Sequence, residues 1–303
     1  MTSKSMGKIK MITDKKLKQA MIVQPNSLVS ASYQMSLNAK RIVVSFLSQL
    51  ESEEKTDMYL SLTNFNKTFG TNLNTRELRA AAKELDGKKI KLASEYTDPS
   101  GSSWCKGDAI TLVDAAVYRD GEIHVGFNMR LMPILVGMTE NFTKYMLRDS
   151  VQLKSVYAVR LYELFKQYQK IGSRTMTIEE LREMFNLQNK YKVTADFRKR
   201  VIDKPLQEIN ENTTLNVSLE LVKYGRKTTG FKFSFRDTAA EKYEKVGQKI
   251  EKALRSNKKV CIGGFSFSAF AGHKPNLKVV GQYGERNFKR LLEENNFEWE
   301  IVR

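Results

Sequence analysis

Apolar residues in the second half of the chain recur first at helical spacing and then at every second position. Three helices are predicted from the helical spacing, over residues 151–168, 178–185 and 194–210. The middle helix follows Thr177, which with Glu180 three residues later forms the sequence pattern of a capping box. Two alternating strands follow, over 215–224 and 230–236. Three helices and then a two-stranded hairpin is the order of a winged helix-turn-helix unit.

The first half follows the same plan with weaker signals. Helices are predicted over 36–50 with Ser36 as the N-cap, over a short segment capped at Thr63, and over 75–85. Strand-like segments are predicted over 88–96 and 109–127, a loop or hairpin tip over 98–108, and a closing helix over 129–145. Asp120 and Gly121 predict a tight hairpin turn. The repetition predicts an α+β fold with two tandem winged helix-turn-helix domains and a C-terminal extension.

Four segments are expected along the chain. They are a basic N-terminal arm at 1–22, a first winged-helix domain at 23–147, a second at 148–237, and an extension of unknown role at 238–303. Within the extension, a basic helix is predicted over 241–259, then one or two strands and an amphipathic helix over 287–295. The extension is a candidate accessory module that binds DNA, a host factor or a second copy of the chain.

Charge narrows the class of partner. The chain has 51 Lys and Arg against 34 Asp and Glu, a formal net charge of +17 at pH 7. A surplus of this size favours a polyanion, because each phosphate contact releases condensed counterions; the alternative is a charge that serves solubility alone. The basic N-terminus lacks the apolar run of a signal peptide, and no stretch approaches the roughly 18 apolar residues of a membrane span. A cytoplasmic protein without membrane association is therefore expected.

Few residues suit metal or disulfide chemistry. Cys105 and Cys261 are too few for a disulfide framework or a four-cysteine zinc site. His124 and His273 are too far apart in sequence to predict a shared imidazole site. We therefore expect no catalytic residue, no metal and no cofactor.

The third helix of the second half carries the clearest candidates for DNA recognition. Its apolar positions fall on one side and are expected to pack on the domain: Val201, Ile202, Leu206 and Ile209. Lys and Arg at the start of such a helix suit the guanine edge in a major groove. The candidates here are Lys190, Lys192, Thr194, Arg198, Lys199 and Arg200. Arg198 falls toward the packed side, where it could still reach a phosphate. Pro205 should disturb the helix, so base contacts are placed before it.

The loop between the two strands, residues 224–229, is the predicted wing tip. Its DNA-binding candidates are Lys223, Arg226, Lys227 and Thr228, since a wing of this kind contacts phosphates or a minor groove. In the first half, Arg76, Arg79 and Lys83 lie on the corresponding helix, beside three small alanines. This helix is predicted to contact phosphates and protein. For all these residues the alternative is a solvated, functionally incidental cationic surface.

Two segments carry a resemblance to a known family. They are VQPNSLVSASYQMSLNAKRIVVSFLSQL at 23–50 and, more specifically, the run from SVYAVRLYELFKQYQK to GFKFSFRD at 155–237. Through them the chain resembles the Rep_3 class of plasmid replication initiators. The resemblance implies two winged-helix domains, of which the second reads repeated origin sites (iterons) in double-stranded DNA and the first contacts the DNA backbone and forms a dimer interface. Carried over by motif, the recognition residues are Lys192, Arg198, Lys199 and Arg200, with wing residues Lys223, Arg226 and Lys227.

The resemblance also implies a cycle of partners. A monomer would activate the origin and help to open it, and a dimer would repress its own promoter and so contribute to copy control. The host replication initiator, the replicative helicase and chaperones are the implied partners.

Three other functions are weighed against this hypothesis. A rolling-circle nicking enzyme needs a nucleophilic tyrosine and, as a rule, paired histidines that hold a metal, and no such pair is present. A plain transcriptional regulator would need only the same two domains. An ATP-driven origin-melting protein is disfavoured because no GxxxxGK[ST] motif is present. We therefore expect a DNA-binding initiator that is not an enzyme.

Overall fold

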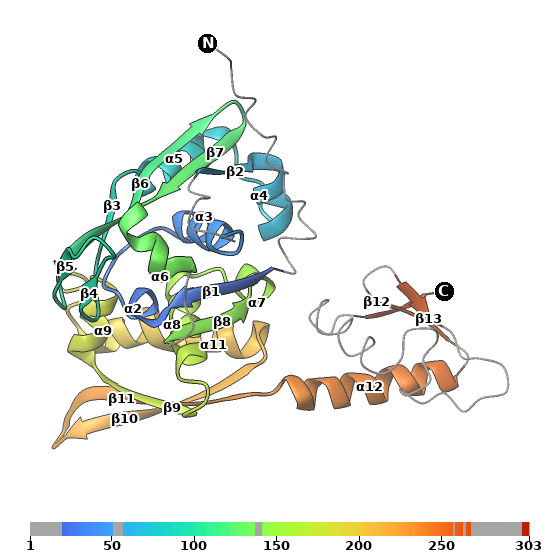
Figure 1. The fold of residues 1–303 in the computed structure, drawn as a ribbon. Helices are drawn as coiled ribbons and strands as arrows, with labels where there is room; N and C mark the ends of the chain where they lie inside the picture. Colours follow the sequence, from blue (N-terminus) through green and yellow to red (C-terminus); the bar gives the residue numbers. More distant parts are fainter. Residues whose placement is uncertain are drawn as a thin grey trace, which may run out of the picture.

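The two halves of the chain fold with the same order of helices and strands (Figure 1). The computed structural model describes residues 20–50, 57–136, 141–256, 258–262, 265–267 and 299–302. The predicted N-terminal arm up to residue 19 and the predicted helix over 287–295 lie outside these residues. Two winged helix-turn-helix units in an α+β fold are present, as the repeated pattern predicted.

The first unit consists of three helices and a four-stranded antiparallel sheet. The helices are α3 (Leu37–Leu47), α4 (Leu62–Phe69) and α5 (Thr75–Leu85), and the sheet has the order β2-β7-β6-β3, formed by β2 (Asp57–Ser61), β3 (Lys88–Lys91), β6 (Ala109–Arg119) and β7 (Glu122–Phe127). Ser36 caps α3 through Ala39 N–H as predicted, but the cap of α4 is Ser61 and not Thr63. Asp120 and Gly121 both have positive φ at the β6–β7 turn, which the predicted hairpin requires.

The predicted helix over 129–145 is wrong. The segment contains two short helices, η1 (Met129–Leu131) and α6 (Met132–Val136), and then strand β8 (Phe142–Met146), which leads into α7 (Leu147–Val151). β8 pairs with β1 (Met21–Pro25), which precedes the small helix α2 (Asn26–Val29). The partner strand lies more than a hundred residues away in sequence, so the local pattern did not reveal it. The loop or hairpin tip predicted over 98–108 contains the turn between the short paired strands β4 (Tyr96–Thr97) and β5 (Ser103–Trp104), the strand β5 itself and the residues after it.

The second unit repeats the plan with a smaller sheet. Its elements are α8 (Val156–Gln167), β9 (Ser173–Thr177), α9 (Ile178–Met184), α10 (Thr194–Phe197), α11 (Lys204–Asn212), β10 (Leu215–Tyr224) and β11 (Lys227–Asp237), with strand order β10-β11-β9. The capping box of Thr177 and Glu180 is formed as predicted. The first helix begins at Val156, not at 151, because Ser155 caps it. The predicted loop over 224–229 is shorter, since β11 already begins at Lys227.

The third helix of this unit runs on from α10 to α11 through a π-helical segment, η2 (Arg198–Asp203). Within it the N–H of Lys204 donates to the carbonyl of Lys199, five residues earlier. Pro205 has no N–H and clashes with the carbonyl four residues before it in a regular helix. A wider turn relieves both problems, because carbonyls before the proline can pair with later N–H groups. The disturbance of the helix that was predicted from Pro205 is therefore this π-helical segment.

A single buried cluster runs through both units, from Ile22 to Phe235. Arg160 of α8 is fully buried within it and donates to the carbonyls of Ala31, Tyr33 and Met184, the last at 2.6 Å. Its guanidinium also lies 3.8 Å from the centre of the Tyr33 ring. Since two of these carbonyls precede α3 and the third ends α9, one cation joins the first unit to the helix-turn-helix of the second.

A second buried polar contact crosses the same junction. Lys40 of α3 and Glu163 of α8 pair at 2.9 Å, and the Tyr145 hydroxyl donates to Glu163 at 2.6 Å. Burial opposes the charge on Lys40, but Glu163 and the Tyr33 hydroxyl more than offset it and raise the pKa of Lys40. Burial and Glu163 together raise the pKa of Tyr145 well above its usual range. Removing one partner of this buried contact would leave the other without its main interaction.

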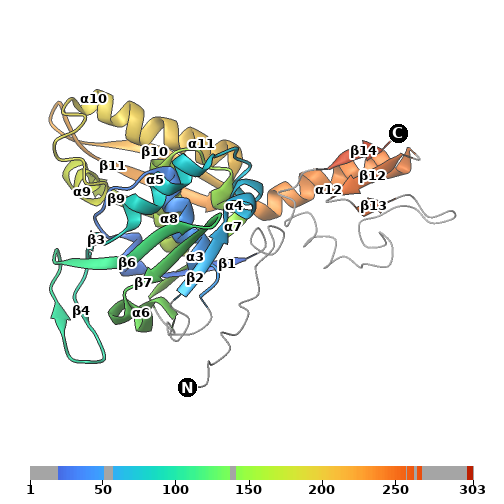
Figure 2. The same ribbon diagram turned by 90° about the horizontal axis from the view of Figure 1, so that it is seen from above.

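The extension forms a second, smaller body beside the winged-helix units (Figure 2). Helix α12 (Ala239–Arg255) confirms the predicted basic helix, and the short strands β12 (Lys259–Ile262), β13 (Phe265–Phe267) and β14 (Glu300–Val302) pair in the order β13-β12-β14. Its own core contains Ile250, Ala253, Leu254, Val260 and Ile262. Among the described residues, no helix is long and apolar enough to span a bilayer.

Candidate nucleic-acid interface

The cationic residues at the start of the α10–α11 helix face solvent. Lys190, Lys192, Thr194, Lys199 and Arg200 are exposed and Arg198 is half-buried, while the apolar positions of the same helix are buried: Phe197, Val201, Ile202, Leu206 and Ile209. The helix therefore packs through one side and presents the predicted recognition residues on the other. No side chain caps its N-terminus, so its first N–H groups remain available to a ligand.

Two acidic side chains hold the arginines of this surface. Asp196 accepts from Arg200 Nε at 2.7 Å, and Asp203 accepts from Arg198 Nε at 3.1 Å. The hydrogen bond to Asp196 and its charge raise the pKa of Arg200. Because each contact uses Nε, the terminal nitrogens of both guanidinium groups remain free to donate to a base edge or a phosphate. The pairs orient the arginines, a feature that sequence reasoning missed.

Arg182 of α9 binds the turn between α9 and α10, residues 185–193, and sequence reasoning missed this residue too. Its guanidinium donates to the carbonyls of Lys190 at 2.7 Å and Tyr191 at 2.5 Å, and it lies 4.6 Å from the centre of the Phe197 ring. Tyr191 adopts a positive φ of 51° there. Tyr157 of α8 forms a hydrogen bond with Tyr191 of this turn, so α8 also contacts the turn. Burial and this hydrogen bond raise the pKa of Tyr157 to about 12. Only the folded turn brings these groups together, and no local sequence signal marks them.

The wing of the second unit ends in an exposed cationic tip. β10 and β11 turn at Gly225, which has a φ of 58°, and Lys223, Arg226 and Lys227 are all exposed. Lys223 pairs with Thr228 and Tyr224 with Lys227, beyond a register shift between Val222 and Lys223, so these side chains sit on paired strands up to the tip. Tyr224 is 84% exposed, and its flat ring at the tip suits stacking on a sugar or a base. Sequence reasoning did not single out Tyr224, although its position beside Gly225 indicates that it lies at a turn.

A glycine seats the base of the wing. Gly230 of β11 pairs with Thr177 of β9, and a Cβ at this position would lie 2.5 Å from the carbonyl oxygen of Met176. No real Cβ approaches backbone so closely, so only glycine lets β11 dock here. Because Thr177 is also the cap of α9, the wing and the helix-turn-helix share one attachment.

The predicted residues of the first unit lie on α5. Arg76, Arg79 and Lys83 are exposed, and the guanidinium of Arg79 lies 5.6 Å from the centre of the Tyr118 ring. The helix starts with a capping box of Asn74 and Glu77. These residues do not join the cluster of the second unit, since α5 lies in the upper part of Figure 1 and the β10–β11 wing in the lower part. In Figure 2, however, α5 and the α10–α11 helix both lie on the upper side of their own sheets, as drawn.

The described residues offer no metal-binding site of three or more His, Cys, Asp or Glu side chains. His124 lies on β7 with its side chain 49% exposed, 3.8 Å from Glu122, as a surface strand residue. His273 is outside the described part of the chain.

Two family models match the chain. Residues 21–166 match "Initiator Replication protein, WH1" and residues 177–235 match "Initiator Rep protein, WH2". An uncharacterized 27.6 kDa protein of Escherichia coli is 27% identical over 243 residues, which cover 75% of this chain and 97% of that protein. The PI protein of Escherichia coli is 24% identical over 289 residues, covering 82% of this chain and 92% of that protein.

One solved structure with a similar chain is the crystal structure of Pi initiator protein in complex with iteron DNA. It shares 20% sequence identity and has a TM-score of 0.47, covering 73% of this chain and 98% of that chain.

Proposed function

The chain belongs to the family of initiator replication proteins, since the two family models together cover more than half of it, and on that premise we propose that it initiates plasmid replication by binding tandem origin repeats in double-stranded DNA. The observation that carries the proposal is the pairing of this family match with an exposed cationic helix and wing on one domain. In the absence of such a surface, family membership alone would leave the DNA-binding face unassigned.

The two units take different parts in the proposed complex. The second domain, residues 148–237, inserts the start of the α10–α11 helix into a major groove, where Lys199 and Arg200 donate to base edges. The β10–β11 wing holds phosphates through Arg226 and Lys227. The first domain, residues 23–147, contacts the backbone through α5 and forms a dimer interface. Support comes from the exposure of these residues and from the position of each helix on the upper side of its own sheet in Figure 2.

Binding energy alone drives the proposed mechanism. Several copies on neighbouring repeats bend and strain adjacent DNA, and the strain lowers the cost of opening it. The host replication initiator, helicase and chaperones act on the same complex, and a dimeric form represses the gene that encodes it. The protein works in the cytoplasm with no catalytic residue and no cofactor.

A nuclease footprint on the DNA beside the gene tests the proposal. Protection should recur at equally spaced repeats on one face of the duplex. A plasmid that carries only those repeats should be maintained when the gene is supplied from elsewhere. Protection without plasmid maintenance would identify a transcriptional regulator, and a covalent protein–DNA adduct on supercoiled DNA would identify a nicking enzyme.

A further inference from the structure

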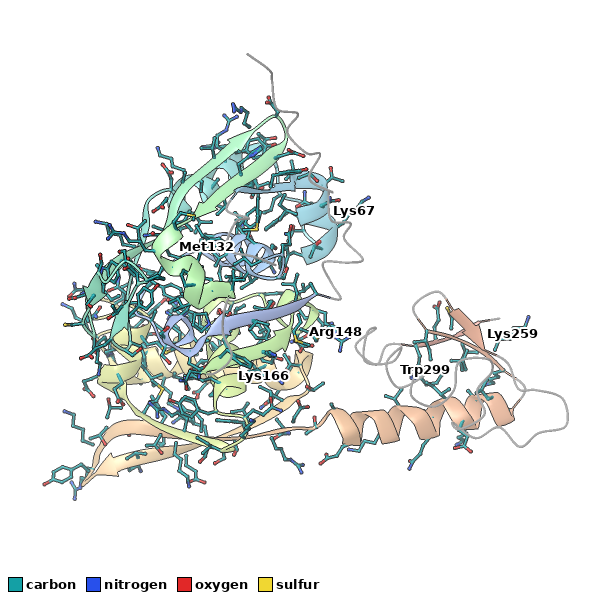
Figure 3. All side chains as sticks on the ribbon, viewed as in Figure 1. Lys67, Met132, Arg148, Lys166, Lys259 and Trp299 are labelled. Atoms are coloured by element: carbon teal, nitrogen blue, oxygen red, sulfur yellow. The ribbon has the colours of Figure 1, made fainter. Side chains whose placement is uncertain are left out.

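Helix α12 presents a row of lysines outside both matched domains, which end at residue 235. Lys245, Lys249 and Lys252 are exposed and follow at spacings of four and three, so they lie along one face of the helix. We name these three residues the α12 lysine surface; Lys258 and Lys259 are also exposed but follow the helix, and Lys259 projects from the small sheet (Figure 3). The three lysines span about 10 Å at a rise of about 1.5 Å per residue.

The apolar side of α12 is already covered. Ile250, Ala253 and Leu254 are buried against Val260 and Ile262 of β12, and Trp299 packs on the same cluster. Figure 3 shows Trp299 between the helix and the small sheet. An amphipathic helix that enters a membrane needs its apolar face free. The covered face therefore leaves the cationic side as the binding side of this helix.

The charges of the α12 lysine surface are not neutralised within the described residues. No carboxylate described in the structure forms an ion pair with any of its three ammonium groups, whereas Lys40, Lys166 and Lys232 elsewhere in the chain all have acidic partners. A lysine ammonium is a compact point charge that suits a row of phosphates, whereas the planar fork of arginine gives a better match to a base edge.

We infer that the α12 lysine surface is a second, sequence-independent binding site for the phosphate backbone of duplex DNA. The inference rests on the proposed function, which brings a duplex to the same polypeptide. The spacing fits, because about 10 Å corresponds to the axial rise of about three base pairs at about 3.4 Å each. The extension thus adds affinity and footprint length, while the choice of sequence remains with the second winged-helix domain.

The test compares full-length chains that differ only in exposed lysines. One variant carries Lys245→Gln, Lys249→Gln and Lys252→Gln. Its matched control carries Lys67→Gln, Lys106→Gln and Lys144→Gln, which are exposed lysines on other surfaces; Lys67 projects from α4 in Figure 3. Fluorescence anisotropy measures the affinity for an origin-repeat duplex and for an unrelated duplex of equal length across a series of salt concentrations.

The slope of log affinity against log salt should decrease by about 2–3 for the α12 variant on both duplexes, since each phosphate contact contributes about 0.9. The ratio of the two affinities should stay unchanged, and the control should keep the full slope. An unchanged slope or an equal decrease in the control would overturn the inference. So would a variant that binds both duplexes normally and loses only its binding to vesicles of anionic phospholipid, measured by co-sedimentation. Should the triple variant lose helical circular dichroism, the double variant Lys245→Gln with Lys249→Gln tests the same surface, with a decrease of about 1–2.

Failure of the proposed function is visible separately. If the unaltered protein binds the origin repeats no better than the unrelated duplex, the proposed function is wrong. The difference in slope between the α12 variant and the control would still report on the lysine surface.

Discussion

The two helix-turn-helix motifs of the chain hold their turns with different side chains. In the first, Asn66 of α4 donates to the carbonyl of Leu73 at 2.9 Å and accepts from Thr71 and from Leu73 N–H. In the second, Arg182 of α9 spans a longer turn and binds its carbonyls with a charged group. The short amide reaches the groups of the compact turn, while the longer arginine side chain reaches the carbonyls of the longer turn.

The helices that follow these turns differ in the same direction. α5 is regular and starts with a capping box; of its three consecutive alanines only Ala80 is exposed, since Ala81 and Ala82 pack into the core, so the expected small alanine surface is not formed. The α10–α11 helix has no side-chain cap, contains a π-helical segment, and orients Arg198 and Arg200 with acidic partners. The capped helix satisfies its own first N–H groups, whereas the uncapped helix with oriented arginines leaves donors available to a ligand. Under the proposed function, this difference assigns backbone contact to α5 and base contact to the α10–α11 helix.

The wings complete the contrast. The β6–β7 tip carries Arg119 beside Asp120, both exposed and 3.9 Å apart, so its net charge is small. The β10–β11 tip carries only cations and Tyr224. We expect substitutions in the second motif to have larger effects than their counterparts in the first.

The largest contrast is expected between the two turn-holding residues. Arg182→Ala removes charged hydrogen bonds and the contact with Phe197, and should lower the free energy of unfolding by about 3 kcal/mol. Asn66→Ala should cost about 1–2 kcal/mol, since its hydrogen bonds are neutral. Urea denaturation of both variants measures the difference. Equal losses would contradict the view that the second turn depends on its clamp.

The two wings should differ in their tolerance of a methyl group. Gly230→Ala places a Cβ against the Met176 carbonyl and should cost about 2–3 kcal/mol through displacement of β11. Gly121→Ala at the β6–β7 turn has open space around it and should cost only about 1 kcal/mol, from its positive φ. Thermal unfolding provides the comparison. A Gly230→Ala protein as stable as the Gly121→Ala protein would show that the wing base can shift freely.

Contacts that distinguish bases should be confined to the α10–α11 helix of the second unit. Arg200→Ala should weaken binding to the origin repeat by about 1–3 kcal/mol and relax base preference at one position. Arg76→Ala on α5 should weaken binding to all duplexes alike and by less than about 1 kcal/mol. Mobility shifts with repeats mutated at single positions separate the two. Sequence preference lost in the Arg76 variant would reverse the assignment of roles.

The smallest expected effect lies at the wing tips. Lys227→Ala should weaken all duplexes similarly and reduce the salt slope by about 0.9, the value for one phosphate contact. Arg119→Ala in the other wing should leave the slope nearly unchanged, because Asp120 already offsets its charge. Titrations at several salt concentrations decide between them, and two equal slopes would remove the distinction between the wings.

Local patterns predicted most of the elements that build the two motifs. Ser36, Thr177 and Glu180 act within four residues of their partners, so their caps were readable from the sequence. The β10–β11 hairpin was predicted from strict alternation, although its turn proved tighter. The exposure of the predicted cationic residues follows from the same helical periodicity. The roles of these residues in DNA binding stay predictions.

Other features depended on distant partners. β8 reads as helix locally and becomes a strand because β1 pairs with it. Arg160 resembles an ordinary helical cation until three carbonyls from two units surround it. Gly230 lies in a good strand pattern, and only the approach of Met176 explains why no side chain fits. Each of these requires the tertiary structure, which the sequence pattern does not contain.

The π-helical segment takes up one extra residue without changing the register of the helix on either side. A regular α-helix advances about 100° per residue, and the wider turn absorbs the additional residue between Arg198 and Asp203. Phe197 before the segment and Ile209 after it are therefore both buried on the same domain. A lineage of such proteins can gain or lose a residue at this point while both anchored ends of the helix keep their places.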